Sequence, residues 1–248
     1  MRELSSLGEK AFRTKQLWHW IYNRGEQNFF RMSTISRQLQ QKLSEEFTIG
    51  RLKIDREQTS LDQTRKWLFN LNDGNKIETV FIPEQDRGAV CISSQVGCSL
   101  SCTFCHTGTM KLVRNLTANE IVGQFMSVRD SYGEWPSPIH NRMISNIVMM
   151  GMGEPLFNYD EIAKGLKIIM DKEGISLSRR RITLSTSGVI PFIDRCGIEL
   201  GVNLAISLHA VTDELRDTLV PINKKYPLRE LLAACHRYPR ANNARRIT

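Results

Sequence analysis

Residues 97–106 read Gly97-Cys98-Ser99-Leu100-Ser101-Cys102-Thr103-Phe104-Cys105-His106, so three cysteines share one short loop. Three thiolates are one fewer than the four ligands that close a structural zinc site or complete an iron–sulfur cluster. A cluster held by three cysteines keeps one iron open for a substrate or cofactor. The spacing therefore predicts a catalytic 4Fe–4S centre with Cys98, Cys102 and Cys105 as its ligands.

Two other metal chemistries fit the same loop less well. Zinc would need His106 as its fourth ligand, but His106 directly follows Cys105, and adjacent residues seldom both reach one tetrahedral ion. Residues 102–106 also match the C-x-x-C-H pattern of haem attachment, which leaves Cys98 unexplained and belongs to exported proteins. The first ten residues contain no apolar run like that of a signal peptide.

The composition indicates a cytoplasmic protein with a basic surface. A chain of 248 residues with 41% hydrophobic content can bury the core of one large domain and a small appendage, and no stretch approaches the length of a membrane span. The three remaining cysteines, Cys91, Cys196 and Cys235, are scattered, which argues against a secreted disulfide framework. The net charge of +8 makes a polyanionic partner plausible.

The hydrophobic pattern divides the chain into three parts. Residues 1–50 have helical spacing, and basic residues there precede Trp18, Trp20 and Tyr22, a combination that suits RNA phosphates and bases but equally suits the core face of a helix. Residues 51–88 predict a β extension with a hairpin formed by residues 66–71 and 76–82. We expect residues 1–50 to be an RNA-binding accessory domain and residues 89–248 to be the core.

In that core, predicted strands and helices alternate, which indicates parallel strands with crossover helices. The predicted strands are residues 89–94, 142–150, 181–185 and 202–208, and the predicted helices are residues 117–131, with a Thr117–Glu120 capping box, and 160–171. In such folds the chemistry lies at the carboxyl ends of the strands. The cysteine loop, the Gly151–Glu154 turn, residues 185–187 and residues 207–209 all follow strands, so we expect them to converge.

The turn at Gly151–Glu154 is the second candidate for binding a ligand. Its glycines permit close approach of a ligand to the backbone, and the Glu154 carboxylate could accept a hydrogen bond from an ammonium group or a ribose hydroxyl. A plain strand-to-helix connection is the alternative interpretation.

With the cysteine loop, these segments resemble the RlmN/Cfr family of radical S-adenosylmethionine RNA methyltransferases. The matching segments are Glu78–Pro83, Ser93–Cys98, Met149–Pro155, Leu184–Gly188, Ala205–His209 and Pro221–Tyr226. Val96, Pro155 and the run 185–188 look more like RlmN, which methylates carbon 2 of adenosine in 23S rRNA and in tRNA. A Cfr-type carbon-8 methyltransferase, or a radical enzyme acting on another RNA, is the alternative.

The resemblance implies a fold, cofactors and partners. The fold would be α/β, a partial (β/α)6 barrel cut after about four strands, with an N-terminal helical domain and a small β hairpin extension. The cofactors would be a 4Fe–4S cluster and S-adenosylmethionine, and the partners 23S rRNA, tRNA and a flavodoxin-type electron donor. The full-length protein would be a monomer without membrane attachment.

The resemblance also implies roles for individual residues. The positions that match cofactor contacts are Gly153, Glu154, Ser185, Ser207, Leu208 and His209. Glu78 matches the proton acceptor for the adenine ring, and Cys91 matches the cysteine that forms a disulfide to release the product. Their chemistry is suitable, because a carboxylate can remove a proton and a thiol can exchange.

The family's methyl-carrying cysteine lies in an Ala-Ala-Cys-Gly-Gln motif that nothing in this sequence matches. Cys235, in Ala233-Ala234-Cys235-His236, imitates part of the motif but lies in a helical pattern, so we expect it, like Cys196, to be structural. Residues 245–248 look like the start of a fifth strand. We therefore expect a fragment that cannot complete RNA methylation.

Overall fold

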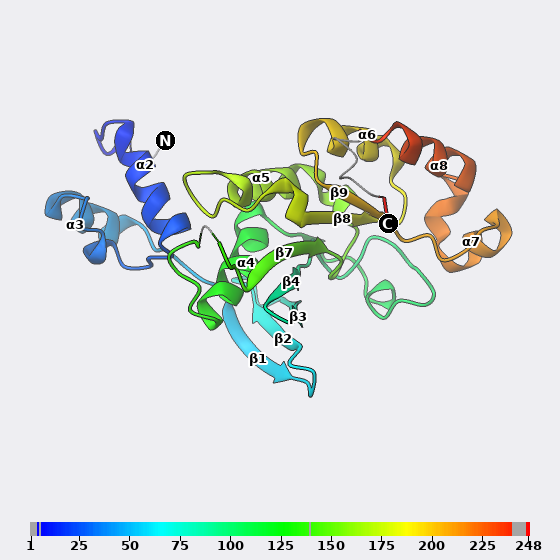
Figure 1. The fold of residues 1–248 in the computed structure, drawn as a ribbon, viewed down its shortest axis with the longest axis horizontal. Helices are drawn as coiled ribbons and strands as arrows, with labels where there is room; N and C mark the ends of the chain where they lie inside the picture. Colours follow the sequence, from blue (N-terminus) through cyan, green and yellow to red (C-terminus); the bar gives the residue numbers. More distant parts are fainter. Residues whose placement is uncertain (1–3, 5, 139, 240–246) are drawn as a thin grey trace.

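The computed structural model describes residues 4, 6–138, 140–239 and 247–248 (Figure 1). In this part of the chain, seven strands form one sheet in the order β1-β2-β3-β4-β7-β8-β9, and β5 and β6 form a separate ribbon. The strands are β1 Lys53–Thr59, β2 Arg65–Asn70, β3 Lys76–Glu84, β4 Arg87–Cys91, β5 Gln95–Val96, β6 Arg114–Asn115, β7 Ile144–Met149, β8 Ile182–Thr186 and β9 Asn203–Ile206. The α-helices are α2 Phe12–Trp18, α3 Arg37–Glu46, α4 Ala118–Ser131, α5 Tyr159–Met170, α6 Ile190–Glu199, α7 Asp213–Leu219 and α8 Leu228–Arg237. Shorter turns of helix are the π-helical η1 His19–Asn23 and the 3₁₀ segments η2 Phe29–Arg31, η3 Thr107–Thr109, η4 Pro155–Asn158, η5 Arg179–Arg181 and η6 Pro221–Lys224.

The first half of the sheet is antiparallel and contains the predicted hairpin. β2 pairs with β3 from Arg65↔Phe81 to Asn70↔Lys76, and Gly74 has the positive φ of +82° that the connecting turn needs. β1, which the sequence analysis did not predict, adds a third antiparallel strand at the edge. Because β3 also pairs with β4, the extension and the core share one continuous sheet, and the division of the chain into domains stays a prediction.

The second half of the sheet is parallel, as predicted. β4, β7, β8 and β9 pair side by side, and Ile247 adds a parallel bridge to Leu204, where the sequence predicted a fifth strand to start. The first predicted strand, residues 89–94, is shorter than expected and ends at Cys91. The reason is that the side chain of Gln124 in α4 accepts a hydrogen bond from the Ser93 N–H and donates one to the Ser93 carbonyl.

The two faces of the sheet have different environments. On one face, strand residues pack with the apolar sides of α4, α5 and α6 in one core, which includes Ile77, Phe81, Val90, Ile147, Leu184 and Leu204. On the other face, the residues that alternate with these are half-buried; they include Glu78, Val80, Cys91, Val148 and Thr183. This second face is the inner face of the partial barrel.

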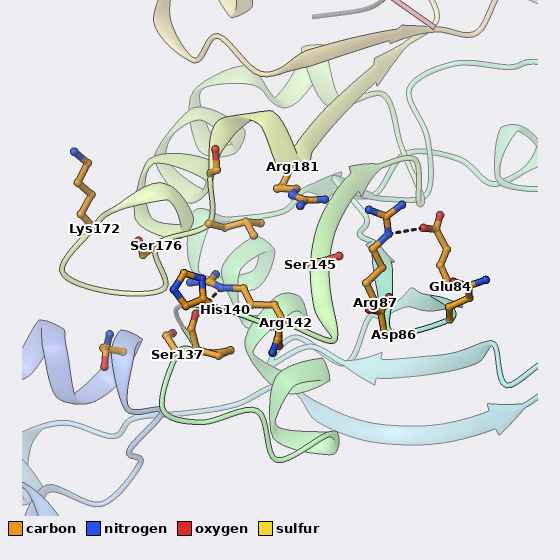
Figure 2. Close-up of a pocket in the computed structure, with 16 residues that line it drawn as sticks. Glu84, Asp86, Arg87, Ser137, His140, Arg142, Ser145, Lys172, Ser176 and Arg181 are labelled. Atoms are coloured by element: carbon orange, nitrogen blue, oxygen red, sulfur yellow. Dashed lines mark hydrogen bonds and ion pairs between the residues drawn. The ribbon is translucent and has the colours of Figure 1, made fainter. Parts of the chain in front are cut away.

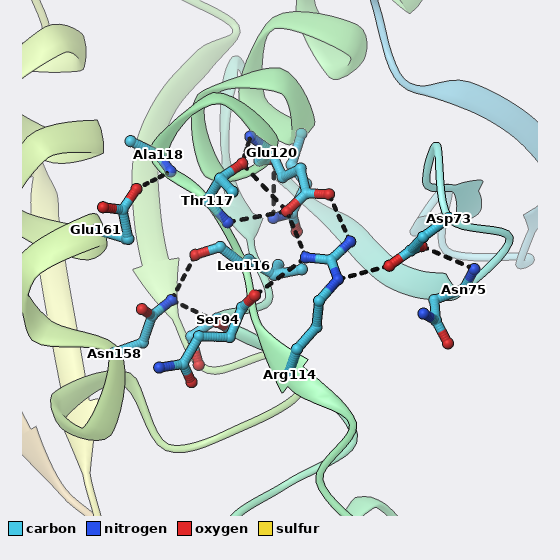
Figure 3. A network of polar contacts seen from close by, with 12 residues as sticks. Asp73, Asn75, Ser94, Arg114, Leu116, Thr117, Ala118, Glu120, Asn158 and Glu161 are labelled. Atoms are coloured by element: carbon cyan, nitrogen blue, oxygen red, sulfur yellow. Dashed lines mark hydrogen bonds and ion pairs between the residues drawn. The ribbon is translucent and has the colours of Figure 1, made fainter.

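A polar network ties the hairpin and the loop after β6 to the helical layer (Figure 3). Arg114 donates two hydrogen bonds of 2.8 Å to the Glu120 carboxylate and one of 2.6 Å to Asp73 in the hairpin turn. These carboxylates raise the pKa of Arg114, and Arg114 in turn lowers the pKa of Asp73. Glu120 also closes the predicted capping box with Thr117, so the start of α4 is held from two sides.

The N-terminal helices have a core of their own. Leu17, Phe29, Met32, Leu39 and Leu43 pack together in it. Towards the sheet, Trp18 donates a hydrogen bond of 3.1 Å to Asp171, and its ring lies 4.4 Å from that of Tyr22. In the described part of the chain, no helix has the length and apolar character needed to span a membrane.

Candidate functional site

The loops at the carboxyl ends of the parallel strands enclose a cavity of about 430 Å³. Its walls come from the cysteine loop, the turn after β7, the end of β8 and the end of β9. Among the lining residues are all three predicted cluster ligands and all six predicted cofactor positions: Cys98, Cys102, Cys105, Gly153, Glu154, Ser185, Ser207, Leu208 and His209. The expected convergence is therefore present.

The cysteine loop leaves β5 through a glycine that no other residue can replace. Gly97 has a φ of +75°, and a Cβ there would lie 2.1 Å from the Lys111 carbonyl oxygen. Burial raises the pKa of the Cys98 and Cys102 thiols. Metal binding requires the thiolate, so a bound metal must offset this cost.

The three cysteines of the loop all line this one cavity. In the described residues, no three His, Cys, Asp or Glu side chains gather closely enough to hold one metal ion. The two chemistries differ in their ligand sets, because a structural zinc ion takes four protein ligands, whereas a cluster held by three cysteines keeps one iron open.

Glu154 joins two of the loops around the cavity. Its carboxylate accepts hydrogen bonds from the Leu156 N–H at 3.1 Å and from the Ser187 N–H at 2.8 Å, and its burial raises its pKa. The preceding Gly153 has a φ of +97°, and a Cβ there would lie 2.5 Å from the Gln95 side chain. The turn is thus packed tightly against the strand that carries the cysteine loop.

Gln95 is a residue of this site that the sequence analysis missed. Its buried side-chain oxygen accepts hydrogen bonds from the Glu154 N–H at 3.0 Å and from the Ser99 N–H at 3.2 Å. Its amide nitrogen donates to Asn115 at 2.8 Å. One amide therefore connects the cysteine loop to the Gly153–Glu154 turn; its place within the matched segment 93–98 was the only signal in the sequence.

Arg216 in α7 is the second residue that was missed. It is fully buried, and its guanidinium donates to the carbonyls of Leu208 at 3.0 Å, Ser207 at 3.2 Å and Ser187 at 2.7 Å. A fourth hydrogen bond of 2.7 Å goes to Asn223. Arg216 thus holds the ends of β8 and β9 together behind the cavity, and no spacing in the sequence indicates this.

His209 lies at the mouth of the cavity in an unusual conformation. Its φ is +57°, which non-glycine residues adopt rarely, and its ring packs against that of Phe104. Burial, with a further contribution from Arg216, lowers the pKa of His209. The imidazole is therefore neutral at pH 7.

Glu78 and Cys91 do not line this cavity but lie on the inner face of the sheet. The pairing Val80↔Cys91 puts the side chains of Glu78, Val80 and Cys91 on the same face. Glu78 forms an ion pair of 3.0 Å with Lys66. Burial raises the pKa of Cys91 to about 11, although the Met150 N–H hydrogen bond works against that shift. Met150 itself lines the cavity, so Cys91 lies one contact away from it.

The other two cysteines lie in the outer helical layer. Cys196 is buried in α6, with its sulfur 3.6 Å from the Tyr238 hydroxyl, and Cys235 is half-buried in α8. Neither lines the cavity.

Comparison with known proteins gives one consistent result. Residues 2–49 match the ribosomal RNA large subunit methyltransferase N-terminal domain, and residues 92–245 match the radical SAM superfamily. The chain is 66% identical to the dual-specificity RNA methyltransferase RlmN of Gluconobacter oxydans, covering 99% of this chain and 61% of the relative. For the protein of the same name from Rhodospirillum rubrum, the identity is 65%, with coverage of 99% and 58%.

A solved structure agrees with these relatives. The crystal structure of a radical SAM methyltransferase from Sphaerobacter thermophilus has a TM-score of 0.88 and 42% identity, over 99% of this chain and 71% of that one. The chain spans about 60% of the length of the curated relatives described above. On these matches, it belongs to the radical SAM superfamily and, within it, to the RlmN/Cfr family.

Proposed function

We propose that the whole protein methylates carbon 2 of adenosine in 23S rRNA and in tRNA, and that this chain supplies the part that binds the cluster and S-adenosylmethionine. The observation that carries this proposal is the single cavity at the carboxyl ends of the parallel strands, which brings the three cysteines and the Gly153–Glu154 turn together. The name dual-specificity RNA methyltransferase, which the relatives carry, supports the choice of substrates.

Membership of the radical SAM superfamily implies a 4Fe–4S cluster and S-adenosylmethionine as cofactors. Cys98, Cys102 and Cys105 would hold the cluster, and the six cofactor positions would hold S-adenosylmethionine. The site fits both groups, because it offers three thiols, a close-packed glycine turn and a volume within the usual range of about 300–1,000 Å³ for small-molecule pockets. When bound, the cluster supplies the electron that cleaves S-adenosylmethionine.

The inner face of the sheet would carry the proton chemistry. Glu78, in its ion pair with Lys66 at 3.0 Å, would be the carboxylate that accepts a proton from an adenine ring. Cys91 is protonated at neutral pH, because burial raises its pKa to about 11, so it must lose its proton before it can form a disulfide. The Cys91 disulfide would form with the methyl-carrying cysteine, whose motif this sequence does not match.

The expected partners follow from the same proposal. RNA suits the net charge of +8, and a flavodoxin-type protein would deliver electrons to the cluster. The protein would act in the cytoplasm as a monomer. This chain alone would cleave S-adenosylmethionine without completing the methylation of RNA.

The test is anaerobic reconstitution of the chain with iron and sulfide, followed by electron paramagnetic resonance with and without S-adenosylmethionine. We expect a reduced-cluster signal that shifts when S-adenosylmethionine is added, and its loss in Cys102→Ala but not in the control Cys196→Ala. A stoichiometric zinc site with no cluster signal would overturn the proposal.

Mass spectrometry then tests the reaction. Release of 5′-deoxyadenosine without methylated RNA is the expected result for this chain. Detection of 2-methyladenosine would show that the chain contains its own methyl carrier, and 8-methyladenosine would favour the Cfr-type reaction.

A further inference from the structure

A second, larger hollow of about 1030 Å³ lies at the opposite pole of the sheet (Figure 2). Its walls are formed by the β3–β4 turn, the segment that leads into β7, the loop after α5 and the end of η5, just before β8. Asn23 of η1 adds a wall from the N-terminal helices. We call this hollow the basic groove.

Four cations line the basic groove: Arg87, Arg142, Lys172 and Arg181. Arg87 forms an ion pair of 3.0 Å with Glu84, and Arg142 donates a hydrogen bond of 2.7 Å to the Pro138 carbonyl and feels the charge of Glu134. Within the described residues, Lys172 and Arg181 have no carboxylate within ion-pair distance. Asp86 is the one other acidic residue in the lining. Arg179 and Arg180 of η5 extend the positive charge beyond the rim. The groove therefore has an excess of unpaired positive charge.

The side chains of Lys172 and Arg181 make few contacts that would stabilise the fold. Both are exposed, and among the residues that the structure describes, the side chain of Arg181 forms one long hydrogen bond of 3.4 Å, to Asn146. Cations that share a groove repel one another, and the two acidic residues in the lining, Glu84 and Asp86, offset only part of that repulsion. An anionic ligand would offset it.

The basic groove and the cysteine cavity cannot hold the same chemical group. β7 runs from the groove, where Ser145 lines the wall, to the cavity, where Met149 does. Ser145 and Met149 are four residues apart in this strand, which is about 13 Å at 3.3 Å per residue. A ligand that occupies both sites must therefore be extended, with negative charge where it lies in the groove.

We propose that the basic groove binds backbone phosphates of the RNA substrate, away from the nucleotide that enters the cysteine cavity. The choice of RNA as the polyanion rests on the proposed function. The shape supports an extended ligand, because the cations come from four separate segments and line a hollow at the upper limit of small-molecule pockets. Three serines, Ser137, Ser176 and Ser178, also line the groove and carry hydroxyl groups suited to phosphate oxygens, whereas the hydroxyl of the buried Ser145 donates to the Gly88 carbonyl.

The test compares two double variants with the same change in charge. Lys172→Gln/Arg181→Gln alters the groove, and Lys167→Gln/Arg229→Gln removes two exposed cations that line neither hollow. Binding of an unmodified tRNA transcript is measured by fluorescence anisotropy over a series of salt concentrations. Circular dichroism and S-adenosylmethionine binding by the reconstituted protein check that each variant is folded.

We expect the groove variant to bind tRNA about tenfold more weakly at physiological salt, with a salt slope reduced by about 1.4 to 1.8, as for the loss of two phosphate contacts. The control variant should change by less than twofold, and Lys172→Arg/Arg181→Lys should retain the affinity. Equal weakening in both glutamine variants, or no weakening in either, would overturn the proposal.

Two further outcomes separate this proposal from the proposed function. If the wild-type protein binds tRNA only as tightly as the groove variant does, the proposal for the groove is wrong, and the proposed function still stands. If the wild-type protein cleaves S-adenosylmethionine but does not bind tRNA, both the proposal for the groove and the proposed RNA substrate are wrong. Loss of binding to ATP, used as a small anionic probe, with unchanged binding to tRNA, would reassign the groove to a nucleotide.

Discussion

The Phe104 ring packs against the His209 imidazole, with ring centroids 4.1 Å apart and planes inclined by 44°. Phe104 lies between two of the cluster cysteines, Cys102 and Cys105, while His209 follows β9. The contact therefore joins the cysteine loop to a cofactor-binding segment more than a hundred residues away. Because both residues line the cavity, any movement of one loop changes the wall formed by the other.

Phe104→Ala should weaken S-adenosylmethionine binding more than it weakens the fold. A ring pair of this kind contributes about 0.5–1.5 kcal/mol, which corresponds to about a two- to twelvefold loss of affinity. Because Phe104 is 51% exposed, we expect the free energy of unfolding to fall by less than about 1 kcal/mol. Isothermal titration calorimetry of the reconstituted protein measures the affinity.

Phe104→Tyr is the matched control, because it keeps the ring contact with His209 and should bind as the wild type does. If Phe104→Ala binds S-adenosylmethionine with unchanged affinity, the contact has no part in shaping the cavity.

Arg216→Met should be strongly destabilising. It would leave three backbone carbonyls and the Asn223 side chain without their donor, at about 1–3 kcal/mol for each group that stays buried. We expect urea unfolding to show a loss of at least about 3 kcal/mol. Arg216→Lys keeps the charge and part of the hydrogen bonding, so its loss should be roughly half as large.

The lysine variant separates a positioning role from a purely structural one. At a temperature where Arg216→Lys is fully folded, its affinity for S-adenosylmethionine should still be reduced, because the Ser207 and Leu208 carbonyls lose part of their support. Full affinity in the folded lysine variant would mean that Arg216 stabilises the fold alone.

The alternation of strands and helices in the core could be predicted because burial on one face imposes a regular spacing of apolar residues. Once the strands are parallel, their carboxyl ends meet at one edge, so the convergence of Cys98, Glu154 and His209 follows from topology alone. β1 could not be predicted in this way. All its residues are exposed, and it is held by pairing with β2 and by contacts such as the hydrogen bond from Trp67 to Glu57.

The polar residues that connect the loops were also beyond prediction. Gln95 and Arg216 have no periodicity or motif, since their partners are backbone groups brought close only by the folded sheet. The same holds for Asn158, whose side chain donates hydrogen bonds of 2.8 Å to the carbonyls of both Ser94 and Leu116 (Figure 3).

Gln95→Glu should reduce the amount of cluster bound after reconstitution. The change keeps an oxygen for the Ser99 and Glu154 N–H groups but removes the donor to Asn115, and it puts a second carboxylate beside the buried Glu154. We expect at least a twofold loss of iron per chain, measured by iron and sulfide analysis. The control is Gln41→Glu on the exposed face of α3, which should bind the wild-type amount. Equal iron content in Gln95→Glu and wild type would show that the link to the turn is dispensable.

Cys91 should react slowly with iodoacetamide in the folded protein. A pKa of about 11 in place of the ordinary cysteine value of 9.0 lowers the thiolate fraction about a hundredfold at neutral pH, and the greater nucleophilicity of a more basic thiolate recovers about tenfold. The net expectation is a rate about tenfold lower than that of the same cysteine in urea, measured by mass spectrometry of the peptide that contains Cys91. The rate in the folded protein should continue to rise from pH 9 towards pH 11, whereas the rate in urea should level off near pH 9.

Because the raised pKa disfavours the thiolate in the folded state, the contribution of the Cys91 thiol to the free energy of unfolding is complete below pH 9 and is lost as the pH rises towards 11. A folded-state rate that levels off below pH 9 would show that the Met150 N–H hydrogen bond outweighs burial, and Cys91 would then be a thiol ready for exchange at rest.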